Sequence, residues 1–152
     1  MRYYPYSEFL QDTRKLASMI EEEFDTIVAI ARGGLTLAHF LAEAKGVRSV
    51  VAINSIGYDD QQKRDKVDLA HIPDLGSSKK ALIVDDIVDS GDTMKAVRGE
   101  LRSRYPNVML RSAALFYKKG AKLKPDFFVQ YADEWIDFFW TRDMNDTDDR
   151  QL

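Results

Sequence analysis

Ala81-Leu82-Ile83-Val84-Asp85-Asp86-Ile87-Val88-Asp89-Ser90-Gly91-Asp92-Thr93 is an apolar run that leads into two acids and then into small, hydroxylated residues. Its start has the branched, apolar composition of a buried strand, which we expect over residues 80–85. We expect a loop over 86–92 and a helix over 93–104. Ligands of α/β proteins bind where such strands end, so this run predicts both a fold class and a binding site.

The same alternation of strand and helix patterns continues through the rest of the chain. A helix that Ser7 can cap carries apolar residues at helical spacing as far as Phe24. A second helix is expected over 35–45, ended by Gly46. The predicted fold class is α/β, a mostly parallel twisted sheet flanked by helices, with further strands over 26–31, 47–54, 108–117 and 127–131.

The length of 152 residues suits one compact domain. We expect a single domain over 1–152, with a core over about 25–131 and a small C-terminal hood over about 132–142. Residues 55–78 are polar and lack an apolar period, so they predict a long loop, either a functional lid or a disordered segment. The polar, acidic tail over 145–152 is expected to fray.

Composition restricts the possible partners. The formal net charge is −3, so no basic surface for nucleic acid is expected. The absence of cysteine excludes disulfides, thiolate metal sites and a cysteine nucleophile. The longest fully apolar runs, such as Ile27 to Ala31, are too short to cross a bilayer, so we expect no integral membrane segment and a cytoplasmic location.

The residues after the third predicted strand suit a sugar phosphate. Backbone N–H groups at a helix N-terminus form an anion site, to which the hydroxyls of Ser90 and Thr93 can add donors, and Gly91 permits close approach. The paired carboxylates of Asp85 and Asp86 would repel a phosphate unless they bind ribose hydroxyls or Mg²⁺. The alternative is a solvated acidic turn that only caps the following helix.

Every position from Leu82 to Thr93 resembles the phosphoribosyl-pyrophosphate fingerprint of the type I phosphoribosyltransferases. The resemblance implies that Asp85 and Asp86 hold the ribose hydroxyls, directly or through hydrated Mg²⁺. It implies that Asp89 is the catalytic proton acceptor near N7 of a purine. It also implies that the 5′-phosphate lies on Asp89, Ser90, Gly91, Asp92 and Thr93, although the xanthine-guanine branch of the family commonly has glycine at the position of Asp92.

Two further segments fit the same family. The Arg32-Gly33-Gly34 turn can face an anion with main-chain N–H groups and a permanent charge, or it can be a purely structural turn. By resemblance, Arg32 and Gly33 grip the pyrophosphate, often through an unusual backbone geometry. Ser55 and Tyr58 begin the segment where the family has its mobile flap, which would close over the sugar and exclude water.

The residues that would select the base lie in the last quarter of the chain. The 6-oxopurine branch of the family has a lysine at the position of Lys118, and the ammonium of that lysine donates to O6 of the base. Lys119 is the alternative if the register shifts by one residue. The competing interpretation is that Lys118 is an ordinary surface lysine. Resemblance assigns stacking to Trp135 and the far edge of the base to Ile136 and Asp137. Trp135 can instead be part of a hydrophobic cap, the interpretation favoured for three further aromatic residues, Phe138, Phe139 and Trp140.

Residues 25 to 140 have a layout similar to that of the short bacterial xanthine-guanine branch. That resemblance implies a Mg²⁺-dependent transferase of purine salvage, acting on phosphoribosyl pyrophosphate and guanine, xanthine or hypoxanthine, as a homodimer or homotetramer. A non-enzymatic sensor of nucleotides or phosphoribosyl pyrophosphate on the same fold is the alternative. P-loop and dinucleotide-binding motifs are absent. His39 is expected to be packed or at an interface, and neither it nor His71 has a partner at metal-ligand spacing.

Overall fold

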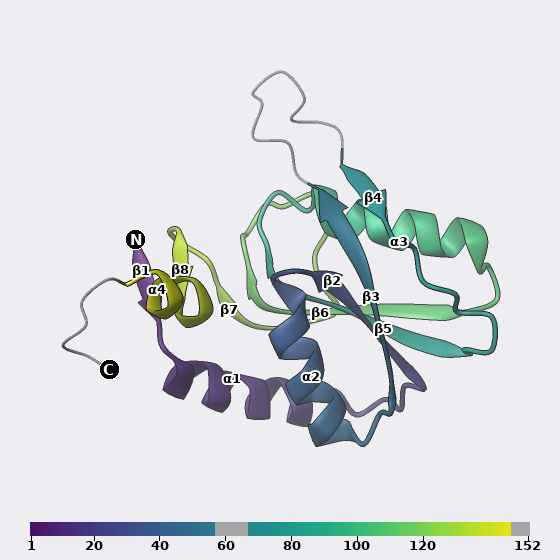
Figure 1. Cartoon of the computed structure of the whole chain (residues 1–152), viewed down its shortest axis with the longest axis horizontal. Coiled ribbons are helices and arrows are strands. Elements are labelled where there is room, and N and C mark those ends of the chain that lie inside the picture. The colour runs from purple at the N-terminus through teal and green to yellow at the C-terminus, as the bar shows by residue number, and fades with distance from the viewer. Residues whose placement is uncertain (57–66, 147–152) are drawn as a thin grey trace.

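A six-stranded sheet forms the centre of the protein (Figure 1). The computed structural model describes residues 1–56 and 67–146. All neighbouring strands are parallel except β4, which pairs antiparallel with β3. The fold is therefore α/β with a mostly parallel sheet, as predicted, in the strand order β4 (Asp68–Ala70), β3 (Ser49–Ile56), β2 (Thr26–Ala31), β5 (Lys80–Val88), β6 (Met109–Tyr117), β7 (Phe127–Tyr131).

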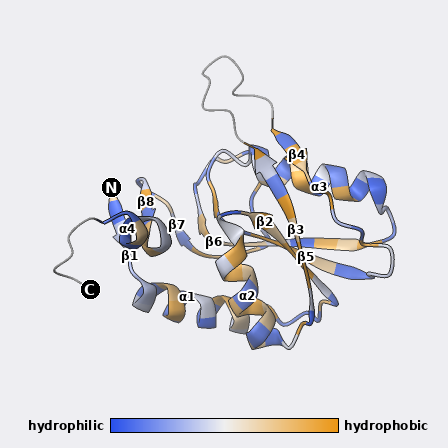
Figure 2. Ribbon diagram, viewed as in Figure 1, coloured by the Kyte–Doolittle hydropathy of each residue, from blue (hydrophilic) through white to orange (hydrophobic). Residues whose placement is uncertain are grey.

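Helices cover both faces of this sheet. Helices α1 (Tyr6–Met19) and α2 (Gly34–Lys45) lie on one side and α3 (Asp92–Arg104) on the other (Figure 1). Two separate clusters of buried apolar side chains result, one under α1 and α2 and one under α3. The buried stretches of β2, β5 and β6, residues 26–30, 81–84 and 113–117, are almost continuously apolar, as expected for strands that are covered on both faces (Figure 2).

The N-terminal strand meets the last described elements of the chain beside the main sheet. Strand β1 (Arg2–Tyr4) pairs in parallel with β8 (Ile136–Phe138), and the short helix α4 (Phe139–Asn145) follows directly. Tyr4 is fully buried and its ring lies edge-on to those of Phe116 and Phe138, at centroid distances of 4.9 and 5.6 Å. This unit of β1, β8 and α4, called the hood below, is thereby attached to the central sheet (Figure 1).

Polar contacts fix β1 to α1 and β7. The Tyr4 hydroxyl donates to Asp12 over 2.6 Å, and Gln130 on β7 donates to the same carboxylate over 2.6 Å and to Glu8 over 2.9 Å. Arg2 donates to Gln130 over 3.0 Å and forms an ion pair with Glu8. The orientation of the hood thus depends on residues at the very start of the chain.

Several boundaries differ from the expectations. Ser7 caps nothing, because α1 begins at Tyr6 after Pro5 and ends at Met19. Strand β5 continues three residues past Asp85, since Asp85, Ile87 and Val88 stay in register with β6. His39 is exposed on the solvent side of α2 rather than packed. The segment expected as a long loop contains β4, and the C-terminal part contains β8 and α4.

Candidate active site

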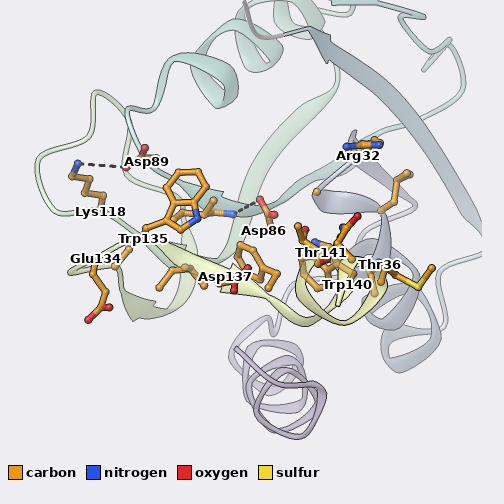
Figure 3. A pocket seen from close by; sticks show the side chains of 18 of the residues that line it. Arg32, Thr36, Asp86, Asp89, Lys118, Glu134, Trp135, Asp137, Trp140 and Thr141 are labelled. Carbon is orange, nitrogen blue, oxygen red and sulfur yellow. Dashed lines mark hydrogen bonds and ion pairs between the residues drawn. The ribbon is translucent and has the colours of Figure 1, made fainter. Parts of the chain in front are cut away.

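A cavity of about 840 Å³ lies between the carboxyl ends of β2, β5 and β6 and the hood (Figure 3). It brings together residues from four separate segments of the chain. Eight of the residues predicted from the sequence line it: Arg32, Gly33, Asp86, Asp89, Lys118, Trp135, Ile136 and Asp137. The other predicted residues of this run, Asp85, Ser90, Gly91, Asp92 and Thr93, do not line this cavity, although they adjoin it along the chain.

The two consecutive carboxylates stand near the end of β5 and are half-buried. The backbone N–H of Asp86 donates to Asp85 over 2.9 Å, and that of Ile87 donates to Asp86 over 2.7 Å. Burial and the adjacent charge of Asp86 raise the pKa of Asp85 well above its ordinary value of 3.8, and burial also raises the pKa of Asp86. Such a pair favours a cation or hydroxyl donors as its ligand.

The turn after β2 approaches this acidic pair. The peptide bond between Ala31 and Arg32 is cis, which is an unusual backbone geometry of the kind expected for this turn. A Cβ atom on Gly33 would lie 2.5 Å from a carboxylate oxygen of Asp86, so only glycine leaves room for that side chain. Gly34 packs equally closely on the β5 backbone at Val84. Arg32 itself is exposed on the cavity wall.

The loop between β5 and α3 consists of Asp89, Ser90 and Gly91. Gly91 has φ +87° at the N-cap of α3, and an added Cβ would lie 2.7 Å from the backbone nitrogen of Leu123. Both constraints require glycine. The first backbone N–H groups of α3 are the donors that an N-terminal anion site needs. The N-cap residue is Gly91, which has no side chain to cap the helix, so neither Ser90 nor Asp92 occupies the N-cap position.

Asp89 and Lys118 face each other across the cavity mouth (Figure 3). Asp89 follows β5 and Lys118 follows β6, and these adjacent strands bring the ammonium nitrogen within 3.6 Å of the carboxylate. The backbone N–H of Lys118 donates to the carbonyl of Val88 over 2.9 Å, which continues the strand pairing to this point. Both side chains are more than half exposed, so a ligand can reach them.

The hood provides the opposite wall. Trp135 exposes 72% of its surface and projects over the cavity beside Lys118 and Asp89 (Figure 3). Ile136 is buried, so it offers the cavity chiefly backbone, whereas the Asp137 carboxylate accepts a 2.5 Å hydrogen bond from Arg142. Phe138 is buried and Trp140 stacks on it at 4.6 Å, which agrees with the packing roles expected for both.

Several cavity residues were not predicted. Thr36 on α2 and Thr141 on α4 line the cavity. The sequence around them has no motif that would have indicated a site. For Thr36, the one indication was its place two residues after the glycine pair. Ser55 lies in β3, opposite Leu69 of β4, and Tyr58 lies outside the described residues.

Comparison with known proteins agrees with this geometry. The family described as "Phosphoribosyl transferase domain" matches residues 2–147. The chain belongs to the phosphoribosyltransferase family. It is accordingly a pentosyltransferase enzyme, and the central sheet with its cavity at the strand ends is the type I phosphoribosyltransferase fold.

Named relatives cover most of the chain. The xanthine-guanine phosphoribosyltransferase of Idiomarina loihiensis is 31% identical over 89% of this chain and 83% of its own length. That of Vibrio parahaemolyticus is 37% identical over 84% and 80%. The solved structure of the Helicobacter pylori xanthine-guanine-hypoxanthine phosphoribosyltransferase is 39% identical, with a TM-score of 0.88 over 94% of this chain and 95% of that chain.

Across the described residues, no helix combines the length and apolar character needed to span a membrane. The same residues contain no group of three or more histidine, cysteine or acidic side chains that could hold a metal ion by themselves. Any metal at the carboxylate pair would therefore need further ligands from water or from a substrate.

Proposed function

We propose that this phosphoribosyltransferase transfers the 5-phosphoribosyl group from phosphoribosyl pyrophosphate to a 6-oxopurine, guanine, xanthine or hypoxanthine, in purine salvage. A purine nitrogen forms a bond to C1 of the ribose, the bond from C1 to the pyrophosphate oxygen breaks, and the base loses a proton. The observation that carries the proposal is the arrangement of Lys118, Asp89 and Trp135 around one cavity.

Each of these three residues has a distinct role toward the base. Lys118 donates to the exocyclic O6, a contact that adenine, with an amino group there, cannot accept. Trp135 stacks on the purine face, because its exposed ring stands over the cavity. Asp89 accepts the proton near N7, and its ion-pair distance to Lys118 of 3.6 Å suits two groups that contact neighbouring atoms of one purine.

The backbone at Ile136 and Asp137 addresses the N1 and N2 edge of the base. Burial of the Ile136 side chain supports a backbone contact there. The bond from Arg142 to Asp137 supports the same view, since it occupies that carboxylate. Hydrogen-bonding groups on the main chain fix the base without demanding one particular substituent at C2.

The ribose and phosphates occupy the strand ends. Asp85 and Asp86 hold the ribose hydroxyls, and the N–H groups and hydroxyls of residues 89–93 bind the 5′-phosphate. Arg32 and the Gly33 backbone bind the pyrophosphate, whose departure they assist by offsetting its charge. Ser55 at the end of β3 and Tyr58 after it lead into the segment proposed as the flap, which would exclude water from the reacting centre.

The carboxylate pair also fits Mg²⁺. Asp85 and Asp86 are adjacent, half-buried and mutually repulsive, and Mg²⁺ is commonly held by one or two carboxylates together with substrate phosphates. A bound ion would neutralise charge on the pyrophosphate. The protein residues meanwhile orient the ribose and the base for displacement at C1.

The proposal also covers the domain organisation, the cellular location and the oligomeric state of the enzyme. We propose a single domain over residues 1–152, a cytoplasmic location and a homodimer or homotetramer. The absence of cysteine suits a reducing compartment. Exposed apolar side chains on α2 and β3, Leu35 at 44%, Val50 at 43% and Ile56 at 48%, are available for contacts between copies. Light scattering after size exclusion measures the mass.

A panel of bases tests the function. Purified protein, phosphoribosyl pyrophosphate and Mg²⁺ are incubated with guanine, xanthine, hypoxanthine or adenine, and pyrophosphate release is followed. We expect release with at least one 6-oxopurine and little with adenine, with the Lys118→Met variant narrowing that difference. Release with adenine alone would refute the role of Lys118. Binding of phosphoribosyl pyrophosphate without turnover of any base would favour the sensor.

A further inference from the structure

The segment proposed to bind the 5′-phosphate, residues 89–93 and called the phosphate loop below, carries the Asp92 carboxylate beside the groups that would bind the phosphate. Asp92 is the first residue of α3, immediately after Gly91. The Ser90 hydroxyl donates to the Asp92 carboxylate over 3.2 Å, and the Asp92 backbone N–H donates to the Ser90 hydroxyl, also over 3.2 Å. The carboxylate therefore competes with a phosphate for the Ser90 hydroxyl, and it carries the same sign of charge.

Lys122 compensates this charge. Its ammonium nitrogen lies 2.7 Å from the other Asp92 oxygen and donates a hydrogen bond to it. This bond is the main cause that lowers the pKa of Asp92, so the carboxylate is ionised at neutral pH and paired rather than free. Asp92 is only 24% exposed, whereas the lysine is 55% exposed, so the pair lies at the rim of the loop.

The backbone around Lys122 is fixed to the phosphate loop. Its N–H donates to the Ser90 carbonyl over 2.8 Å, and the next residue, Leu123, packs against Gly91. One residue earlier, the N–H of Ala121 donates to the carbonyl of Lys118 over 3.0 Å. The segment that starts at Lys118 thus returns to the phosphate loop, which places the Lys122 side chain beside Asp92 through main-chain contacts.

We infer that Lys122 is a positioning residue for the 5′-phosphate: it neutralises Asp92 and holds that carboxylate at the rim, which weakens the repulsion between Asp92 and the phosphate and the competition of Asp92 for the Ser90 hydroxyl. The inference rests on the proposed function, because it assumes that residues 89–93 bind this group. Lys122 acts through Asp92, and the loss of Lys122 is therefore harmful only while Asp92 keeps its charge.

A double-mutant cycle tests this dependence. The Lys122→Met variant leaves Asp92 unpaired, so we expect the KM for phosphoribosyl pyrophosphate to rise about 5-fold, the size of an added like charge near a partly exposed site. The kcat and the KM for the base should stay within about 2-fold, since neither the base nor the chemistry is touched. In the Lys122→Met, Asp92→Asn double variant, the KM should return to within about 2-fold of the wild type.

Two controls separate this effect from general ones. Lys122→Arg keeps the charge and should keep the KM. Lys124→Met removes an equal charge two residues further along the exposed segment, where the ammonium lies over the Phe128 ring, and should leave the KM unchanged. Thermal unfolding of Lys122→Met should stay within about 2 °C of the wild type, because the pair is partly exposed.

The outcomes are distinct. A raised KM that Asp92→Asn restores supports the inference. A KM unchanged in Lys122→Met, or raised equally with and without the Asp92 charge, overturns it, the second result meaning that Lys122 contacts the substrate itself. If none of the tested bases supports pyrophosphate release by the wild-type protein, the proposed function is refuted. The double-mutant cycle is then measured through the affinity for phosphoribosyl pyrophosphate, determined by calorimetry.

Discussion

Replacing Trp135 with alanine should weaken binding of the base far more than it weakens the fold. The side chain is 72% exposed, and the 2.9 Å hydrogen bond that the Trp135 backbone carbonyl accepts from the N–H of Arg2 survives the substitution. Exposed substitutions of this kind change the free energy of unfolding by about 0.5 kcal/mol or less. Loss of a base stack costs about 1–3 kcal/mol, which corresponds to about a 5- to 150-fold rise in KM for the base.

Steady-state kinetics distinguishes these effects. The KM for guanine, measured with saturating phosphoribosyl pyrophosphate, should rise within that range in Trp135→Ala, while the KM for phosphoribosyl pyrophosphate changes little. Trp135→Phe keeps an aromatic face and should recover most of the loss. Unfolding in urea, monitored in parallel, should give nearly the same midpoint for all three proteins.

Fluorescence gives an independent measurement. The chain has two tryptophans, so Trp140→Phe leaves Trp135 as the single emitter. Titration with guanosine monophosphate, the product formed from guanine, should quench that emission as the purine stacks on the indole. A KM for guanine in Trp135→Ala equal to that of the wild type, together with unquenched emission in Trp140→Phe, would refute the stacking role.

Two further changes test the acidic residues. Asp89→Asn should lower kcat at least about 100-fold, the usual contribution of a positioned base, with the affinity for phosphoribosyl pyrophosphate largely kept; unchanged turnover would remove Asp89 from its role. For Asp85, burial and the Asp86 charge raise the folded-state pKa above the ordinary 3.8, so the native protein binds more protons than the unfolded chain between these two values. The free energy of unfolding of the EDTA-treated protein should therefore fall as the pH rises through that window. Asp85→Asn should flatten this slope in pH-dependent urea unfolding and abolish turnover, and an unaltered slope would argue against the repulsive pair.

The parallel core could be predicted because local composition determines it. The strands at 26–31 and 127–131 have the bounds expected from their apolar runs. The left-handed Gly46 ends α2 as predicted. Burial on both faces makes such strands continuous in the sequence, so they are visible without knowledge of their partners.

The hood could not be predicted as a structure, because its strands are three residues long and their pairing is distant. No periodicity can be read from Arg2–Tyr4 or from Ile136–Phe138, and the register between them is set by packing of Tyr4 against Phe116 and Phe138. Likewise, β5 extends beyond Asp85 because β6 continues beside it. This pairing is a tertiary contact, and the two polar residues Asp85 and Asp86 made the sequence look like the end of the strand. The packed alternative for His39 was wrong because its own position faces solvent on an otherwise apolar helix, and the interface alternative stays a prediction.

The pairing of β1 with β8 has a consequence for biosynthesis. On the ribosome, Arg2–Tyr4 emerges about 130 residues before its partner strand, so the nascent chain carries an unpaired aromatic segment through almost the whole of translation. A product terminated by a premature stop codon between residues 131 and 136 would retain every strand of the central sheet and lack β8 and α4. Such a truncation would leave the sheet and remove most of the wall proposed to bind the base.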